Sequence, residues 1–195
     1  MPELSQEQKE IISKIEKKIQ HIVEEETNYA SSKKVYFTQS EGFILSLGLS
    51  NLNLKELPDD VEKLSELIAL DLSRNLLTQI PEQLLKLPKL SVLDLSHNQI
   101  TRVPNWIEKF SLLRDIKLNN NQLYTIPRTI GNCKLVRRIF LQNNRIHSLP
   151  RELLELKLLE ELHLDFRASM HKTTKGILAQ LESKGCKIKS DYNRR

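Results

Sequence analysis

The chain is poor in glycine and cysteine, and this scarcity excludes several kinds of site. Its 195 residues include only five glycines, which stand too far apart to form a loop that cradles a phosphate or a dinucleotide. The two cysteines, Cys133 and Cys186, are too few and too distant in sequence for a disulfide framework. No Asn-x-Ser/Thr sequon occurs either. These absences favour a reducing environment, so we expect a cytoplasmic location.

Long apolar runs are also missing. No stretch approaches the roughly 18 apolar residues that a membrane span requires, and the first residues lack the basic start and apolar run of a signal peptide. Lys and Arg together number 30 and Asp and Glu 25, which gives a net charge of +5. Such a mildly basic, mixed composition does not favour a nucleic acid or a membrane as the partner. We expect a soluble chain that forms one domain.

Catalytic and metal-binding motifs are absent as well. The sequence contains no Gly-x-Ser-x-Gly elbow and no His-Glu-x-x-His pair. His97 and His163 are expected to lie about 14 Å apart at ordinary strand spacing, which is too far to share a metal ion. Cys133 stands where other parts of the chain place core leucines, so a small buried hydrophobe is a better interpretation than a nucleophile. The chain is therefore predicted not to be an enzyme, and to hold no cofactor and no metal.

Aliphatic residues, by contrast, are abundant and recur with a period of 23 residues. Six units begin, with no insertion between them, at Ile44, Leu67, Leu90, Leu113, Val136 and Leu159. Within each unit, apolar residues at the third and fifth positions after the start alternate with other residues, which indicates a short strand. In five units an aliphatic-Pro pair follows, and the apolar residues after it predict a short helical turn that proline can begin.

Four units place asparagine at the eighth position after the start, in an otherwise apolar neighbourhood: Asn75, Asn98, Asn121 and Asn144. A buried side-chain amide both accepts and donates hydrogen bonds, so it can satisfy the backbone groups that the turning strand leaves unpaired. One unit cannot enclose its own leucines. Stability must therefore come from units that stack until their aliphatic residues form a shared core.

The full pattern, LxxLxLxxNxLxxLPxxIxxLxx, resembles that of the leucine-rich repeat family. It is most similar to the 23-residue units of intracellular Ras-suppressor-like scaffolds, of plant intracellular Ras-group repeat proteins and of short prokaryotic or archaeal repeat proteins. The resemblance implies an α/β solenoid, a short right-handed horseshoe arc with a parallel sheet on its concave face, a helical N-terminal cap and a helix-strand C-terminal cap. It also implies a non-enzymatic protein-protein interaction scaffold in signalling, with a small GTPase as the first candidate partner.

The ends of the chain depart from the repeat, so we expect three segments. Residues 1–43 form an amphipathic helical cap and a lead-in strand, residues 44–166 form six repeats of which the last is truncated, and residues 167–195 form a cap helix and an edge strand with a basic tail. The first helix is predicted over residues 5 to about 27, with Ser5 and Gln8 as a capping box. Its apolar stripe is Ile11, Ile12, Ile15, Ile19, Ile22 and Val23.

Three further elements are predicted in these end segments: an edge strand over Lys33 to Phe37 that leads into the repeats, a helix from Thr173 to Lys184 that Gly185 ends, and a strand over Cys186 to Lys189. A dimerising helix is the alternative interpretation of the isoleucine stripe, but the stripe is short for a coiled coil. We therefore expect a monomer, with a dimer through the N-terminal helix as the alternative.

Side chains at the second, fourth and sixth positions of each unit must point out of the concave sheet, opposite the buried leucines. Phe140 is one of them, although packing gives it no reason to stand there. Its neighbours are polar: Lys117, Arg138, Gln142 and His163. An aromatic residue and an arginine amid polar groups are typical of an interface centre, although single exposed apolar residues are also common. The predicted partner-binding residues are Phe140, Arg138, Lys117, Asp71, Asp94, Asp115, His163, Gln142 and Glu161.

Two other surface features could contribute contacts. Trp106 stands in a column of polar residues, where it either offers a second contact or packs over aliphatic neighbours such as Leu85. The C-terminal basic run is either solvated or touches an anionic partner. The alternative function is a self-associating structural element that uses the N-terminal helix or the C-terminal edge strand.

Overall fold

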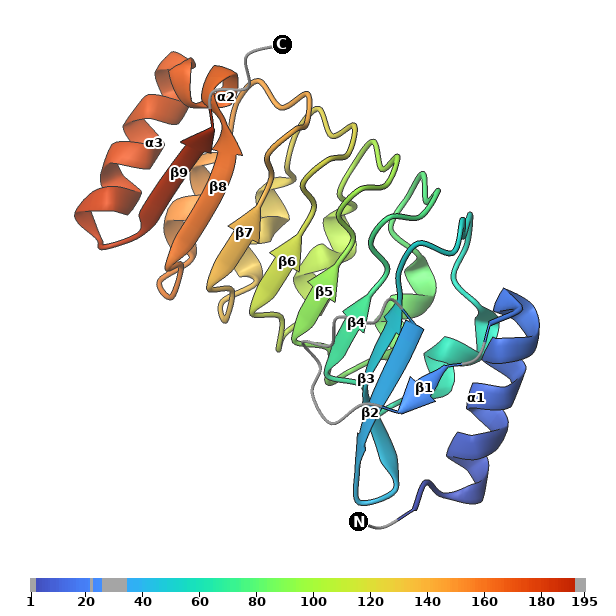
Figure 1. Ribbon diagram of the computed structural model, residues 1–195. Coiled ribbons are helices and arrows are strands. Elements are labelled where there is room, and N and C mark those ends of the chain that lie inside the picture. Colours follow the sequence, from blue (N-terminus) through green and yellow to red (C-terminus); the bar gives the residue numbers. More distant parts are fainter. Residues whose placement is uncertain (1–2, 22, 26–34, 192–195) are drawn as a thin grey trace.

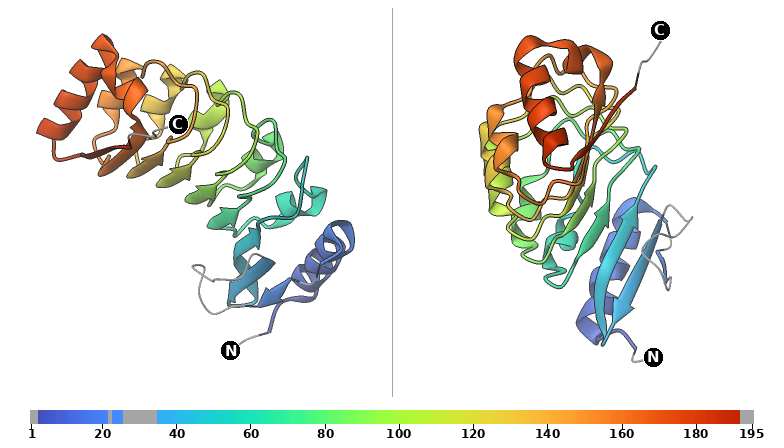
Figure 2. Two further views of the ribbon diagram at one scale, coloured as in Figure 1. Left: turned by 45° about the horizontal axis from the view of Figure 1, so that its top comes forward. Right: turned by 90° about the vertical axis from the view of Figure 1, so that its left-hand side faces the viewer.

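Each 23-residue unit supplies one strand to the inner side of an arc and one short helix to its outer side (Figures 1 and 2). The computed structural model describes residues 3–21, 23–25 and 35–191. The predicted solenoid, with its sheet on the concave face, is confirmed. Within the described ranges, no helix combines the length and the apolar character that crossing a membrane requires.

The strands form a single sheet in which spatial order follows chain order. They are β1 (Glu24–Glu25), β2 (Val35–Ser40), β3 (Phe43–Leu49), β4 (Ala69–Asp71), β5 (Val92–Asp94), β6 (Asp115–Lys117), β7 (Arg138–Phe140), β8 (Glu161–Asp165) and β9 (Lys187–Asp191). From β3 to β9 all pairs are parallel, whereas β2 runs antiparallel to β3 and β1 runs parallel to β2. The two N-terminal strands thus extend the repeat sheet by a hairpin and one further strand.

The register between repeat strands is constant, and this constancy builds the core. The central residue of each strand lies opposite the central residue of the next, as Leu70 does with Leu93 and Leu93 with Ile116. Because the offset is 23 residues at every step from β3 to β8, the aliphatic side chains form continuous columns. Their members are almost entirely shielded, with Leu47, Leu93 and Ile116 all 0% exposed.

The outer side carries the predicted helical turns, which are short 3₁₀ helices. They are η1 (Asp59–Lys63), η2 (Glu82–Lys86), η3 (Asn105–Lys109), η4 (Arg128–Asn132) and η5 (Arg151–Glu155). Each follows the proline of its unit directly, as η2 follows Pro81 and η4 follows Pro127. Proline suits this position because its fixed φ is compatible with a helical start and its missing N–H would have no partner in the first turn.

The N-terminal helix α1 (Gln6–Ile19) is shorter than the sequence predicts. It ends because Gln20 adopts a left-handed conformation (φ 58°) and its N–H bonds to the Glu16 carbonyl oxygen at 2.8 Å. Ile22, which was assigned to the apolar stripe, lies outside the described residues. Ile11, Ile12, Ile15 and Ile19 are buried in the shared core. The stripe that a dimerising helix would need is therefore covered by the chain itself.

The capping box predicted for α1 is only half present. The Ser5 hydroxyl accepts from the Gln8 backbone N–H at 3.3 Å, as an N-cap does. The Gln8 side chain does not return this bond. Its Oε1 accepts from the Ile44 backbone N–H at 3.2 Å instead, which ties the helix to strand β3.

The lead-in strand also differs from the prediction. Residues 33 and 34 lie outside the described ranges, and β2 begins at Val35 and continues to Ser40. It is not an edge strand, because β1 pairs with it on one side and β3 on the other.

At the C-terminal end, a short helix α2 (Phe166–Met170) that the sequence did not reveal precedes the predicted helix α3 (Lys172–Ser183). Ile177, Leu178 and Leu181 of α3 are buried, as predicted. The hydroxyl of Thr174, which is 0% exposed, accepts from the Leu149 backbone N–H at 3.1 Å. Helix α3 therefore stands against the last units in the place of a further repeat.

The asparagine column satisfies the loop backbone as predicted. The Asn98 side-chain Oδ1 accepts from the Leu77 N–H at 3.0 Å, and its Nδ2 donates to the carbonyl oxygens of Leu72 at 3.0 Å and Leu95 at 3.1 Å. Asn75, Asn121 and Asn144 repeat this arrangement. Each amide thus joins its own unit to the one before it. The last unit lacks the asparagine, and the Asp165 carboxylate accepts from the N–H groups of Asn143 and Asn144 there.

Replacing Asn98 by leucine should lower the stability of the fold markedly. The buried N–H of Leu77 would lose its acceptor, and an unsatisfied buried group costs about 1–3 kcal/mol. The carbonyl groups of Leu72 and Leu95 would each lose one of two amide donors, since Asn75 and Asn121 also donate to them. We expect the free energy of unfolding, measured by urea denaturation, to fall by at least that amount. The neighbouring Gln99→Leu is the matched control, because Gln99 is exposed; its effect should stay within about 0.5 kcal/mol. Equal losses for both variants would contradict the assigned role of the column.

Candidate partner-binding surface

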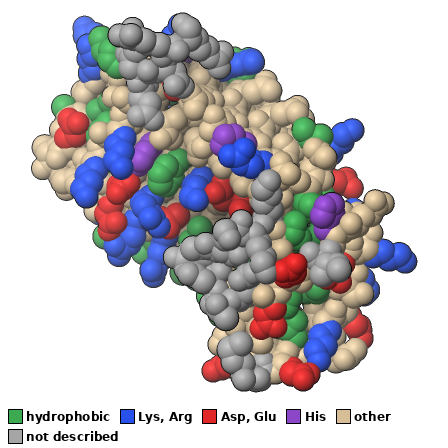
Figure 3. All heavy atoms as spheres, viewed as in Figure 1, with side chains coloured by type: hydrophobic (Ala, Val, Ile, Leu, Met, Phe, Trp, Pro, Cys, Tyr) green, Lys and Arg blue, Asp and Glu red, His purple; other side chains and the backbone are tan. Residues whose placement is uncertain are grey.

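The concave face is built from the residues that flank the buried centre of each short strand. In β7 the Ile139 side chain enters the core, while Arg138 and Phe140 stay on the face. Because the register is constant, residues at equivalent positions of adjacent units become neighbours across the sheet. Figure 3 looks onto this face, where side chains of both charges, histidine and hydrophobic groups lie side by side over β5 to β8.

Two ion pairs cross between strands in the middle of the face. The Lys117 Nζ lies 2.9 Å from an oxygen of Asp94. Arg138 donates through Nε and Nη2 to the two oxygens of Asp115, at 2.7 and 2.6 Å. In both pairs the cation is the outer member, since the side chains of Arg138 and Asp115 are 49% and 10% exposed. A solvent-exposed pair is worth at most about 1 kcal/mol, so the main effect is to hold the cations in place.

Phe140 packs on its neighbour His163, with ring centroids 4.4 Å apart and planes inclined by 36°. The sequence interpretation gave Phe140 no packing role, and this contact corrects it. Phe140 remains half-buried on the concave face, whereas His163 is buried beneath it. The outward direction predicted for Phe140 is therefore confirmed.

Two polar side chains fix the His163 ring from its edges. The Gln142 amide nitrogen lies 3.0 Å from Nδ1, and the Glu161 carboxylate lies 3.0 Å from Nε2. With the amide nitrogen donating to Nδ1, the Nε2–H is the group that donates to Glu161. This hydrogen bond lowers the pKa of Glu161, and Lys189 and Lys187 add to the effect. The Phe140 ring therefore rests on a histidine that cannot rotate freely.

The acidic end of the face is covered by a residue that the repeat pattern does not include. The Tyr36 ring of β2 lies directly over Gly48, where an added Cβ would meet the ring carbon Cε1 at 2.2 Å. Burial raises the pKa of the Tyr36 phenol to about 12, and the negative charges of Asp71 and Asp94 contribute. Only glycine at position 48 leaves room for this ring.

Asp71 and Asp94, the acidic residues predicted to bind a partner at this end, already make hydrogen bonds or ion pairs within the chain. Asp94 already pairs with Lys117, and Asp71 accepts from the Ser73 backbone N–H at 2.8 Å. Burial and the nearby charge of Asp94 raise the pKa of the Asp71 carboxyl, while the bonds from Ser73 oppose that shift. The structure thus brings Lys117, Arg138, Phe140, Gln142, Glu161 and His163 together over β6 to β8, and it places Asp71 and Asp94 beside Tyr36.

Other residues considered from the sequence have structural roles. Trp106 is half-buried and meets Phe110 edge-on, with centroids 6.0 Å apart, so packing explains its position. Burial raises the pKa of the Cys133 thiol to about 11, which leaves it protonated at neutral pH. On the loop between β7 and η5, Arg145 lies over the ring of Tyr124 at 5.6 Å and donates to its hydroxyl. Across residues 3–21, 23–25 and 35–191, no group of three or more His, Cys, Asp or Glu residues could hold a metal ion.

Comparison with known proteins agrees with the repeat architecture. The sequence profile of the leucine rich repeat family matches residues 45–100 and 81–123. A leucine-rich repeat protein of Leptospira interrogans is 35% identical, with a TM-score of 0.68, over 74% of this chain. The match spans 36% of that bacterial protein, so this chain corresponds to about a third of its length. No curated protein matches the sequence.

Two further solved structures are similar. A chain in the Toll-Spatzle complex of Drosophila is 28% identical, with a TM-score of 0.52, over 58% of this chain and 16% of that one. The leucine-rich repeat ectodomain of a receptor kinase from Arabidopsis thaliana is 20% identical, with a TM-score of 0.62, over 83% of this chain and 93% of that one. The Arabidopsis likeness shows the fold alone.

The covered phenol predicts a specific response to alkaline pH. The pKa of Tyr36 is about 12 in the folded chain against 10.0 for a free side chain, so the unfolded state releases this proton first. The contribution of Tyr36 to the free energy of unfolding is therefore fully present below pH 10, and it should be lost as the pH rises from 10 towards 12. Urea unfolding across this range should show a shallower fall for Tyr36→Phe than for the wild type. Tyr124→Phe, which removes an exposed hydroxyl, should fall as steeply as the wild type, and an unchanged slope for Tyr36→Phe would contradict the assignment.

Proposed function

Because this chain belongs to the leucine-rich repeat family, we propose that it is a non-enzymatic module that holds a protein partner on its concave face and flanking loops. The observation that carries the proposal is the cluster of Phe140, Arg138 and Lys117 on β6 and β7. These three side chains are partly exposed, and each is held from below by a more deeply buried group.

The cluster has the composition of an interface centre. Aromatic residues and arginine are enriched among the side chains that dominate binding energy, and they act best when their positions are fixed before binding. Asp115 holds the Arg138 guanidinium through two bonds, and His163 supports the Phe140 ring. A partner therefore meets side chains that lose little conformational freedom on binding.

The remaining predicted residues have distinct roles in this proposal. Asp115 and His163 are buried, so they position Arg138 and Phe140 and touch the partner little. Gln142 and Glu161 form the polar rim on the side of β8. Asp71 and Asp94 would receive basic groups of the partner next to Tyr36, where two carboxylates face one lysine.

The size of the face implies that the loops take part. The short strands offer roughly 300 Å² in projection at normal strand spacing, whereas a standard interface takes about 800 Å² from each partner. Tyr124, which is 51% exposed, and Arg145 form a further aromatic-cation pair on these loops. We assign them to the periphery of the contact.

The class of partner rests on similarity. The repeat pattern resembles that of Ras-suppressor-like scaffolds, which makes a small GTPase or another signalling protein in the cytoplasm the first partner to test. The Toll-Spatzle structure, a complex that contains a similar chain, also supports a protein as the partner.

Self-association has less support from the structure. The isoleucine stripe of α1 is buried, and the sheet edge at β9 carries the exposed residues Lys187 and Lys189. Lysines on an edge strand disfavour pairing with a second copy. We therefore propose a monomeric module.

Phe140→Ala should weaken partner capture much more than it weakens the fold. Losing the stacking on His163 should cost about 0.5–1.5 kcal/mol of stability beyond the burial of the ring. Because the ring is only half-buried, the variant should stay folded. In affinity capture from an extract of cells that express the protein, we expect at least a tenfold loss of each partner held by the wild type.

Phe43→Ala is the matched control, since Phe43 is exposed at 45% and lies at the start of β3, away from the cluster. Its capture should equal that of the wild type. Equal capture by wild type and Phe140→Ala, at equal amounts of folded protein, would refute the concave-face proposal.

A further inference from the structure

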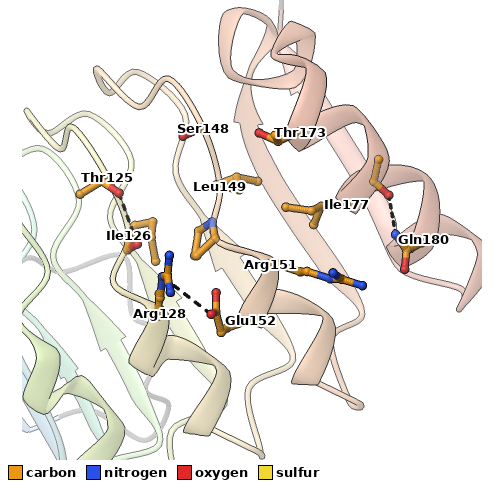
Figure 4. A pocket seen from close by; sticks show the side chains of 12 residues that line it. Thr125, Ile126, Arg128, Ser148, Leu149, Arg151, Glu152, Thr173, Ile177 and Gln180 are labelled. Carbon is orange, nitrogen blue, oxygen red and sulfur yellow. Dashed lines mark hydrogen bonds and ion pairs between the residues drawn. The ribbon is translucent and has the colours of Figure 1, made fainter.

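A second concave surface lies on the helical side of the arc, where α3 meets the last two 3₁₀ helices (Figure 4). It is a groove of about 720 Å³ between the segments that lead into η4 and η5 on one side and one face of α3 on the other. Grooves that hold ligands commonly have volumes of about 300–1,000 Å³. We call it the α3 groove; the residues of α3 that line it are Thr173, Gly176, Ile177 and Gln180.

The chemistry of the α3 groove changes along its length. Its middle is apolar and consists of Ile126, Leu149 and Ile177, whose side chains are each about 95% buried. Thr125, Ser148 and Thr173 line one end, and Arg128, Arg151 and Glu152 line the other, as Figure 4 shows. A bound chain could therefore place an apolar side chain in the middle and charged groups at one end.

The charge at that end favours an acidic occupant. Arg128 and Arg151 are both exposed, and Arg128 lies 3.8 Å from the Glu152 carboxylate with 86% of its side chain exposed. Two arginines and one glutamate line this end of the groove, and only Arg128 pairs with Glu152, which leaves an excess of positive charge. Arginine guanidinium groups bind carboxylates through paired hydrogen bonds. Glu152 disfavours a continuous polyanion, because it would repel the phosphates of a nucleic acid.

Gly176 is an independent sign that the α3 groove accommodates something. It stands inside the 12-residue helix α3, although glycine weakens helices relative to other residues. A Cβ at this position would meet no atom within 4 Å, so packing within the described chain does not require glycine. In contrast, Gly48 and Gly131 leave no room for a Cβ. The absence of a side chain at Gly176 leaves the wall of the groove low at this point.

We propose that the α3 groove docks an extended acidic segment of a protein partner. The segment seats an apolar side chain on Ile126, Leu149 and Ile177, and it directs carboxylates to Arg128 and Arg151. The main chain of the segment passes over Gly176. This surface is separate from the concave cluster around Phe140, so it provides a second contact site and does not depend on the function proposed for that cluster.

The test selects nonapeptides from a random phage-displayed library on the immobilised full chain. The expected result is enrichment of sequences that combine Asp or Glu with a bulky apolar residue. The enriched peptides are then synthesised, and their binding to variants is measured by fluorescence anisotropy. No enrichment above background, or enrichment of basic or neutral sequences, would overturn the proposal.

Two pairs of variants locate the binding site. Gly176→Gln places a side chain over the groove and also favours the helix, so it should raise the melting temperature while weakening peptide binding at least tenfold. Its control is Ala179→Gln, because Ala179 is exposed on α3 outside the groove. Arg151→Glu should weaken binding at least tenfold, and Arg102→Glu, at an exposed position outside the groove, should change it less than threefold.

The result with Phe140→Ala separates this proposal from the first one. Peptide binding should be unchanged in that variant, since Phe140 is not part of the groove. Peptides that lose binding to Phe140→Ala but retain it with Gly176→Gln and Arg151→Glu would assign acidic peptides to the concave face and refute docking in the α3 groove.

Discussion

The fold depends on one constraint, which is that every unit places its central strand residue opposite the same residue of the next unit. This identity of register lets Leu70, Leu93 and Ile116 share a column that is almost entirely shielded from solvent. It also lets one asparagine amide bridge two units, because the groups it must reach recur at the same offset. An insertion of a single residue would move a strand's apolar side chains to the wrong face and break both arrangements.

The same constraint determines the chemistry of the concave face. Side chains at equivalent positions become cross-strand neighbours, so Asp115 finds Arg138 and Phe140 finds His163. In each pair one member is more deeply buried than the other. Asp115 lies below Arg138, and His163 lies below Phe140. The surface offered to a partner is consequently more basic and more aromatic than the strand sequences taken one at a time indicate.

Much of this could be predicted from the sequence, because a strict period reports spatial neighbours directly. The solenoid, the asparagine column and the proline-led helical turns follow from spacing alone. The contact between Phe140 and His163 could also be predicted, since both residues stand four positions after a unit start. The position of Tyr36 over the face could not be predicted, because Tyr36 belongs to a hairpin outside the 23-residue period. The only sign of it in the sequence is the glycine at position 48. The early end of α1 and the α3 groove depend on local backbone geometry and on how the caps pack, which no repeat pattern encodes.

The carboxylate of Asp165 has a consequence for how such an array can lengthen. It accepts from two backbone N–H groups of the loop that follows β7, and the Thr174 hydroxyl accepts from a third N–H group of the same loop. Appending another unit after these residues would displace both acceptors and leave donors bare. A duplication in the interior, between two ordinary units, would leave these hydrogen bonds intact.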